Sequence, residues 1–108
     1  METSESDFLT AAERTLNALE SALEACGADI ETTRAGGVLT LELADGSKIV
    51  VNSQAPTRQI WVAAKSGGYH YAWRDGAWRD TRDGSELFAA LSRIVSAQGG
   101  EAVLLRPS

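Results

Sequence analysis

Four carboxylates near the end of the first expected helix are the residues whose types and spacing best suggest chemistry. Glu20 and Glu24 are one helical turn apart, and Asp29 and Glu31 are two residues apart on the strand expected to follow. Each pair therefore projects from one face of its element. Carboxylate oxygens are hard ligands that suit iron, manganese, magnesium and calcium better than soft metals. We expect a loose, exposed cation-binding surface; the alternative is a solvated acidic face.

The charge distribution along the chain favours the same interpretation. Residues 1–46 hold ten acidic and two basic side chains, whereas residues 47–108 hold five acidic and eight basic ones, within a net charge of −5. Such an excess of acid points away from nucleic acid and towards cations or a basic partner. The expected ligand of the N-terminal half is therefore positively charged.

A second group of candidate residues comes from the alternation of side chains in the expected strands. In the stretch QIWVAA the core positions flank Trp61, which therefore points to the other face of the sheet. The same alternation places Asn52, Gln54 and His70 on that outer face. Burying a large apolar side chain is worth about 1.5–3 kcal/mol, so a tryptophan directed away from the core suggests an interface anchor. Alternatively, Trp61 lies flat on a neighbouring side chain and covers the sheet.

His70 and Cys26 are the single histidine and the single cysteine of the chain. His70 could ligate a metal or a haem iron, with Tyr71 or Cys26 as a second ligand, because histidine is a common axial ligand. The alternative is a surface histidine that contacts protein. One cysteine cannot form an internal disulfide, which suits a reducing compartment.

No pattern typical of an enzyme is present. The sequence has no G-x-S-x-G motif, no glycine-rich phosphate loop and no metal motif with two histidines. No apolar run approaches the roughly 18–20 residues of a membrane span, and the acidic start METSESDF lacks the features of a signal or transit peptide. We therefore expect a cytoplasmic binding protein with neither a membrane nor a nucleic acid as its partner.

Two helices and an antiparallel sheet are expected to position these residues. Apolar residues at spacings of three and four predict one helix over 7–25 and a second one that begins with a capping box at Asp83 and ends before Gly99. Between the helices the period falls to two, which is typical of strands. The order predicts an α+β fold in a single domain, residues 1–108: a two-layer sandwich with both helices on one face of a twisted antiparallel sheet.

The expected strands lie over 28–33, 38–43, 48–52, 59–64 and 69–73, and a further one follows a two-residue turn at 75–76. In the strand 69–73, alternation directs Tyr69, Tyr71 and Trp73 into the core and His70 outward. The tail 101–106 is short and apolar, and we expect it to pack between the helices and the sheet.

Residues 36–73, GGVLTLELADGSKIVVNSQAPTRQIWVAAKSGGYHYAW, resemble the bacterial frataxin (CyaY) family, and the element order is similar over essentially the whole chain. The most specific pieces are GGVLT, DGSKIVVN, the Gln59-Ile60-Trp61 strand and SGGYHY with the tryptophan that follows. The resemblance implies two helices on an antiparallel sheet, and weak binding of ferrous and ferric iron by carboxylates of the first helix and first strand. It also implies binding to the cysteine desulfurase of iron–sulfur cluster assembly, whose activity such proteins regulate.

On this resemblance, Asn52, Gln54 and Trp61 match the surface that contacts the desulfurase and the scaffold protein. The expected function is a monomeric, iron-binding adaptor that is not an enzyme. One alternative is an iron-storage protein or ferroxidase that forms iron-driven oligomers, with weak ferroxidase activity as a side reaction in the adaptor. The other is a haem-responsive protein that uses His70 or Cys26.

The chain departs from the family pattern in its acidic residues. Where bacterial relatives carry acidic pairs, it has Glu20-Ser21 and Glu24-Ala25, and the loop that follows is Cys26-Gly27-Ala28 rather than Asp-rich. Thr33 and Ala44 also lack carboxylates that such relatives can have. We therefore expect lower iron affinity and stoichiometry than in the more acidic members.

Overall fold

One antiparallel sheet forms a complete layer of the fold in a computed structural model, which describes residues 4–106. Its strands lie side by side in chain order, so each strand pairs with its neighbour in sequence. They are β1 (Glu31–Ala35), β2 (Val38–Glu42), β3 (Lys48–Gln54), β4 (Gln59–Ala64), β5 (Gly67–Arg74) and β6 (Ala77–Asp80). Short turns join them, apart from a 3-10 turn at Ala55–Thr57 between β3 and β4.

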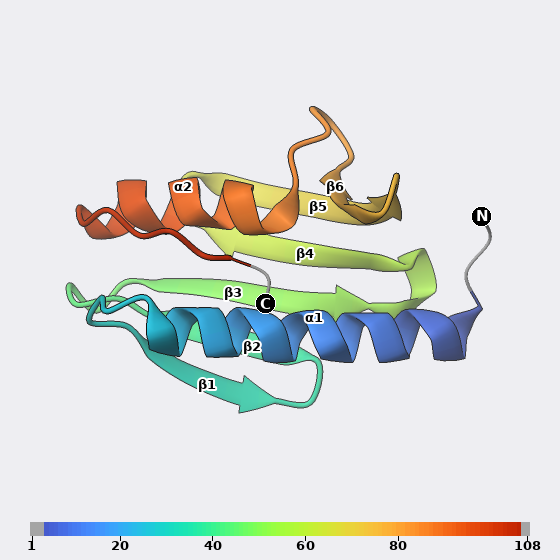
Figure 1. Ribbon diagram of the computed structural model, residues 1–108, viewed down its shortest axis with the longest axis horizontal. Coiled ribbons are helices and arrows are strands. Elements are labelled where there is room, and N and C mark those ends of the chain that lie inside the picture. Colours follow the sequence, from blue (N-terminus) through green and yellow to red (C-terminus); the bar gives the residue numbers. More distant parts are fainter. Residues whose placement is uncertain (1–3, 107–108) are drawn as a thin grey trace.

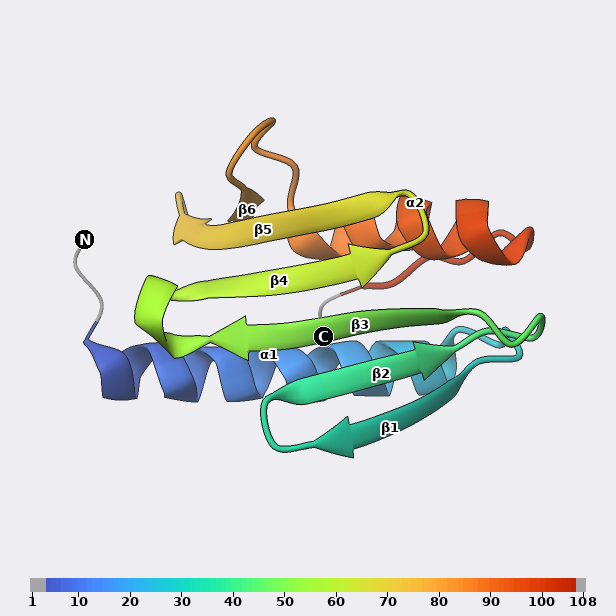
Figure 2. The ribbon, with the colours of Figure 1, turned by 180° about the vertical axis from the view of Figure 1, so that it is seen from behind.

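Two helices form the second layer (Figure 1). The first, α1 (Glu5–Ala25), lies over the side of the sheet that holds β1 to β3, and α2 (Leu87–Gly99) lies over β5 and β6. Figure 2 shows the sheet from behind, with no helix over that face. The expected α+β sandwich, with both helices on one face, is therefore confirmed. Within residues 4–106, neither helix combines the length and hydropathy needed to cross a membrane.

Helix α1 begins two residues earlier than its apolar stripe predicts. Ser4 is the N-cap, and its hydroxyl accepts a hydrogen bond from the Asp7 backbone N–H at 3.2 Å. Gly27, with φ of +80°, follows the last turn and supplies the left-handed conformation that ends many helices. The apolar stripe is buried as expected: Phe8, Ala12, Leu16, Leu19 and Leu23.

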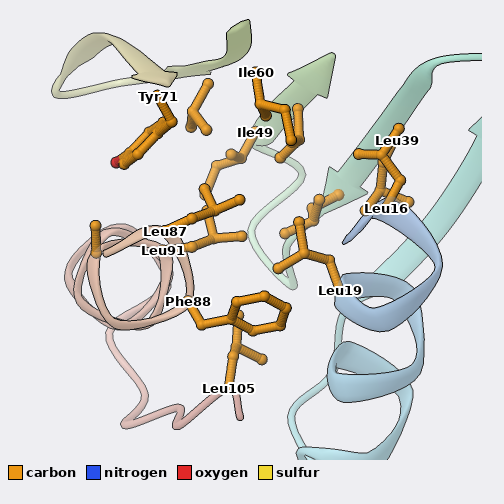
Figure 3. Packing of buried hydrophobic residues seen from close by; sticks show 14 of the residues in the cluster. Leu16, Leu19, Leu39, Ile49, Ile60, Tyr71, Leu87, Phe88, Leu91 and Leu105 are labelled. Carbon is orange, nitrogen blue, oxygen red and sulfur yellow. The ribbon is translucent and has the colours of Figure 1, made fainter. Parts of the chain in front are cut away.

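The core lies between the sheet and the helices, and the C-terminal tail completes it. Figure 3 shows Phe88 of α2, Leu19 of α1 and Leu105 of the tail close together between the helices. Val103 and Leu105 are buried, and their backbone N–H groups donate to the hydroxyls of Ser96 and Ser92 at 2.9 and 2.8 Å. The tail therefore packs between the helices, as expected.

Trp78 of β6 connects the sheet to α1. Its indole N–H donates to the Thr15 hydroxyl at 2.8 Å, and its ring meets Phe8 edge to face with centroids 5.9 Å apart. Trp78 is also paired with Trp73 in the register. Trp73 itself is 48% exposed, so the prediction that it lies in the core was wrong. It has the inward parity, but it lies next to the end of β5, where its ring meets that of Trp78 edge to face with centroids 5.5 Å apart.

The cap of α2 is Glu86 rather than Asp83. The Glu86 carboxylate accepts hydrogen bonds from the backbone N–H groups of Phe88 at 2.8 Å and Ala89 at 3.1 Å. Asp83 instead accepts from the Ser85 N–H at 2.9 Å, in the turn that precedes the helix. The predicted capping box was therefore wrong, because Asp83 stabilises its own turn and the helix starts only at Leu87.

The loop between β2 and β3 makes stability depend on pH. Asp45 accepts hydrogen bonds from the Ser47 hydroxyl at 2.6 Å and its backbone N–H at 2.9 Å, which lower the pKa of Asp45 below 3.8. A carboxyl whose pKa falls on folding stabilises the protein above its unfolded pKa, and this stabilisation is lost as pH falls through the folded value. We expect Asp45→Asn to be less stable than wild type at pH 7 in urea unfolding. The difference should shrink below pH 3.8, and a gap that widens in acid would contradict this account.

Candidate functional site

The four acidic residues expected to bind metal lie around the junction between α1 and β1. Glu20 is half-buried, and Glu24, Asp29 and Glu31 are exposed. Glu31 opens β1, so Asp29 lies outside the strand, and the expectation of both on one strand was wrong. The physical reason is a tight turn in which the backbone N–H of Ile30 donates to the Ala28 carbonyl at 3.0 Å.

These carboxylates form an open surface rather than a cage. In the described chain, residues 4–106, no three side chains among His, Cys, Asp and Glu come together as a metal site. A cation on such a surface would be held by one or two carboxylates and would keep water as its other ligands.

Arg34 of β1 is the residue at this junction that sequence reasoning missed. Its guanidinium lies 2.7 Å from the Glu13 carboxylate and 3.7 Å from that of Glu20, and it donates to the Asn17 side-chain oxygen at 2.8 Å. A further N–H donates to the Gly36 carbonyl at 2.9 Å, and the side chain is only 15% exposed. Arg34 therefore neutralises the middle of the acidic flank of α1. The one signal in the sequence was that Arg34 is one of only two basic residues before position 47.

This arginine divides the acidic surface into two parts. Glu13 and Glu20 are engaged by Arg34, whereas Glu24, Asp29 and Glu31 form no ion pair with any residue of the described range. The carboxylates left for an external cation are therefore those at the C-terminal end of α1 and the start of β1. We call these three residues the acidic end.

The second set of expected site residues is brought together on the outer sheet face. Asn52 of β3 is paired with Trp61 of β4, and Trp61 is paired with His70 of β5, so the three form one row across strands that Figure 2 shows side by side. Gln54 lies two residues along β3, and its side-chain amide donates to the Asn52 oxygen at 3.2 Å. We call these four residues the outer row.

Trp61 is held in place within the outer row. Its ring stacks on the His70 ring, with centroids 4.4 Å apart and planes 13° apart, and its indole N–H donates to the Gln59 side chain at 2.8 Å. The residue is nevertheless only half-buried. Trp61 thus lies flat on a neighbouring side chain, as one alternative expected, and it also presents part of its ring to solvent, as an interface anchor requires.

The structure does not bring the expected haem ligands together. His70 is on the outer face, whereas Tyr71, the next residue of β5, points to the helix side and is fully buried. Cys26 belongs to the helix layer, where its thiol donates to the Leu23 carbonyl at 3.1 Å. Tyr71 does not lie beside His70, because consecutive strand residues alternate between faces. Cys26 does not lie beside His70 either, because it is on the helix side of the sheet.

Comparison with known proteins places this arrangement in a family. A family model described as a frataxin-like domain matches residues 1–101. The chain is 54% identical over 104 residues to an iron-sulfur cluster assembly protein CyaY from Paraburkholderia phymatum, which covers 96% of this chain and 99% of the relative. It is 50% identical over 103 residues to the protein of the same name from Dechloromonas aromatica, with 94% and 98% covered.

Solved structures give the same result. Frataxin from Psychromonas ingrahamii superimposes with a TM-score of 0.88 at 33% identity, over 94% of this chain and 97% of the other. A ferrous complex of trimeric frataxin from the yeast Saccharomyces cerevisiae gives a TM-score of 0.66 at 29% identity, over 94% and 90%. Since the family model spans nearly the whole chain and bacterial relatives share about half of its residues, this protein belongs to the frataxin-like family.

Proposed function

We propose that this protein is a cytoplasmic, monomeric adaptor in iron–sulfur cluster assembly, which binds iron at the acidic end and docks on the cysteine desulfurase complex through the outer row. The observation that carries this proposal is that the acidic end lies at the junction of α1 and β1 whereas the outer row lies on β3 to β5, so that iron and the partner contact different side chains. The names of the CyaY relatives support the pathway, and the ferrous complex of yeast frataxin supports the metal.

Weak iron binding follows from the exposure of the acidic end. Two unit charges 4 Å apart attract each other by only about 1 kcal/mol in water, and salt screens them further. An open set of carboxylates without a cage therefore suits a reversible response to iron better than permanent storage.

The proposal is tested by Glu24→Gln/Glu31→Gln, titrated with Fe²⁺ without oxygen and assayed for desulfurase binding with and without the metal. We expect weaker Fe²⁺ binding and loss of any effect of iron on docking, because two ligands are removed. The matched control is Glu5→Gln/Asp75→Asn, which makes the same charge change at exposed sites in the first turn of α1 and in the β5–β6 turn. Equal losses in both variants would mean that net charge alone attracts the metal.

Removing Arg34 is expected to strengthen iron binding. Arg34→Gln deletes a positive charge and frees Glu13 and Glu20, so the Fe²⁺ affinity should rise about fivefold, the equivalent of roughly 1 kcal/mol. The free energy of unfolding should fall by up to about 1 kcal/mol, since partly exposed ion pairs contribute little. Arg14→Gln is the matched control, because Arg14 is exposed on α1 and forms no ion pair among the described residues. An equal rise in Fe²⁺ affinity in Arg14→Gln would show that the change in net charge, and not the release of Glu13 and Glu20, causes the effect.

The iron-storage alternative has one specific support, the trimeric state of the yeast relative. Size-exclusion chromatography after aerobic loading with Fe²⁺ separates the two functions. The adaptor stays monomeric, whereas a storage protein converts to larger species as iron is added.

A further inference from the structure

A hollow of about 280 Å³ lies between β5, the end of β6 with the segment 81–85 that follows it, and α2. No residue of the acidic end or the outer row lines it, so it is separate from both surfaces of the proposed function. Alanine and isoleucine side chains of α2 form its apolar part. Its polar lining includes Tyr69, Tyr71, Asp80, Asp83, Ser85 and Arg93.

The Tyr71 hydroxyl is the most unusual group of the hollow. Tyr71 is fully buried, and within residues 4–106 its oxygen has no hydrogen-bond partner. Figure 3 shows this oxygen pointing away from the aliphatic side chains of the core. Burial and the nearby carboxyls of Asp80 and Asp83 raise the pKa of Tyr71, so its phenol keeps its proton and can donate it. Buried hydroxyls are normally paired, and an unpaired one destabilises the fold.

Asp80 and Arg93 also keep unused hydrogen-bonding capacity. Asp80 lies opposite Tyr71 in the register, is 4% exposed, and accepts one hydrogen bond, from the Arg82 N–H at 2.7 Å, with no ion-pair partner in the described chain. Arg93 is exposed at the rim, makes one long hydrogen bond to the Ser85 hydroxyl at 3.4 Å, and lies close enough to Asp83 to lower the pKa of that carboxyl. Carboxyl groups this buried are usually paired, and a guanidinium has five N–H donors.

The hydrogen-bonding capacity and the charges of these groups indicate which kind of ligand would fit the hollow. The buried Tyr71 hydroxyl lacks an acceptor among the described residues, and the buried Asp80 carboxylate has room for a further donor, while the exposed Arg93 and Asp83 offer one charge of each sign at the rim. An inorganic anion would be repelled by the two carboxyls, a metal ion would be repelled by Arg93, and an apolar ligand would leave the Tyr71 hydroxyl unpaired. The volume is below the roughly 300–1,000 Å³ of pockets for drug-sized ligands, so the ligand must be small.

We propose that this hollow binds a small α-amino acid as its zwitterion, with the carboxylate held by Arg93 and the Tyr71 hydroxyl and the ammonium group held by Asp80 and Asp83. The site would make the protein responsive to an amino acid at a place distinct from its iron and docking surfaces.

The test is a titration of the folded protein with L-alanine, followed by amide chemical shifts and by melting temperature. We expect shifts in residues 66–71 and 80–94 and a rise in melting temperature, and little effect from methylamine or acetate, which each carry half of the zwitterion. Chemical-shift changes of equal size with methylamine or acetate, or no change with L-alanine, would overturn the proposal and would mean that the hollow holds only water.

Two tyrosine variants separate binding from folding. Tyr71→Phe should raise the melting temperature in the absence of the amino acid, because it removes an unpaired hydroxyl, and should weaken L-alanine binding at least tenfold. Tyr69→Phe is the matched control: its hydroxyl is already paired with Ser66 at 2.7 Å, so this variant should melt lower and still bind. Binding that survives Tyr71→Phe unchanged would also overturn the proposal.

Discussion

Trp61→Ala is expected to weaken binding to the cysteine desulfurase by about 30-fold or more, the equivalent of the roughly 2 kcal/mol that defines an interface hot spot. The tryptophan is fixed by the His70 stack and the Gln59 hydrogen bond before any partner arrives, so little conformational entropy is lost on docking. The free energy of unfolding should change by only about 1 kcal/mol, the size of one cross-strand pair. Affinity and urea unfolding, measured on the same preparations, check both parts.

Thr40→Ala is the control for Trp61, because Thr40 lies on the same outer face, two strands away on β2. It should leave the affinity unchanged. A large loss of stability in Trp61→Ala would make Trp61 a core residue instead of an anchor. If the wild-type protein does not bind the desulfurase, the outer row must serve a different partner.

Trp78→Ala is expected to cause the largest loss of stability, about 3–5 kcal/mol. The variant deletes a buried ring, its edge-to-face contacts with Phe8 and Trp73, and its hydrogen bond to Thr15. Domains of this size are stable by roughly 5–15 kcal/mol in total, so the melting temperature should fall by more than about 10 °C. Thermal unfolding followed by circular dichroism gives this value.

Trp78→Phe distinguishes the contribution of the buried ring to stability from that of the hydrogen bond to Thr15. It keeps an aromatic ring against Phe8, and the Thr15 hydroxyl remains satisfied because it donates to the Ala11 carbonyl at 2.8 Å. We therefore expect a loss well below that of Trp78→Ala. Equal losses would show that the hydrogen bond, and not the buried ring, holds β6 to α1.

The sequence predicted the fold well because each strand pairs with its neighbour. Alternation and short turns then determine register locally, as in the two-residue turn at 75–76 that pairs Trp73 with Trp78. The apolar stripe of α1 likewise predicted which helix residues are buried.

Predictions failed where a residue's environment depends on a different element. Parity placed Trp73 inward, but only the position of α2 decides whether anything covers it. Asp29 and Asp83 each belong to a local turn that periodicity does not reveal. Arg34 reaches from β1 to α1, and no local pattern encodes a contact 21 residues away, so the division of the acidic surface required the structure.

The tail that packs between α1 and α2 is the last part of the core to be synthesised. Helix α1 is made before the strands that it covers, and each strand can pair with its predecessor as it leaves the ribosome, because the sheet follows chain order. Val103 and Leu105 are made after every other core residue. A nascent chain that lacks them could form the sheet but not the part of the core between its helices, so this core closes only after residues 103–105 have been made.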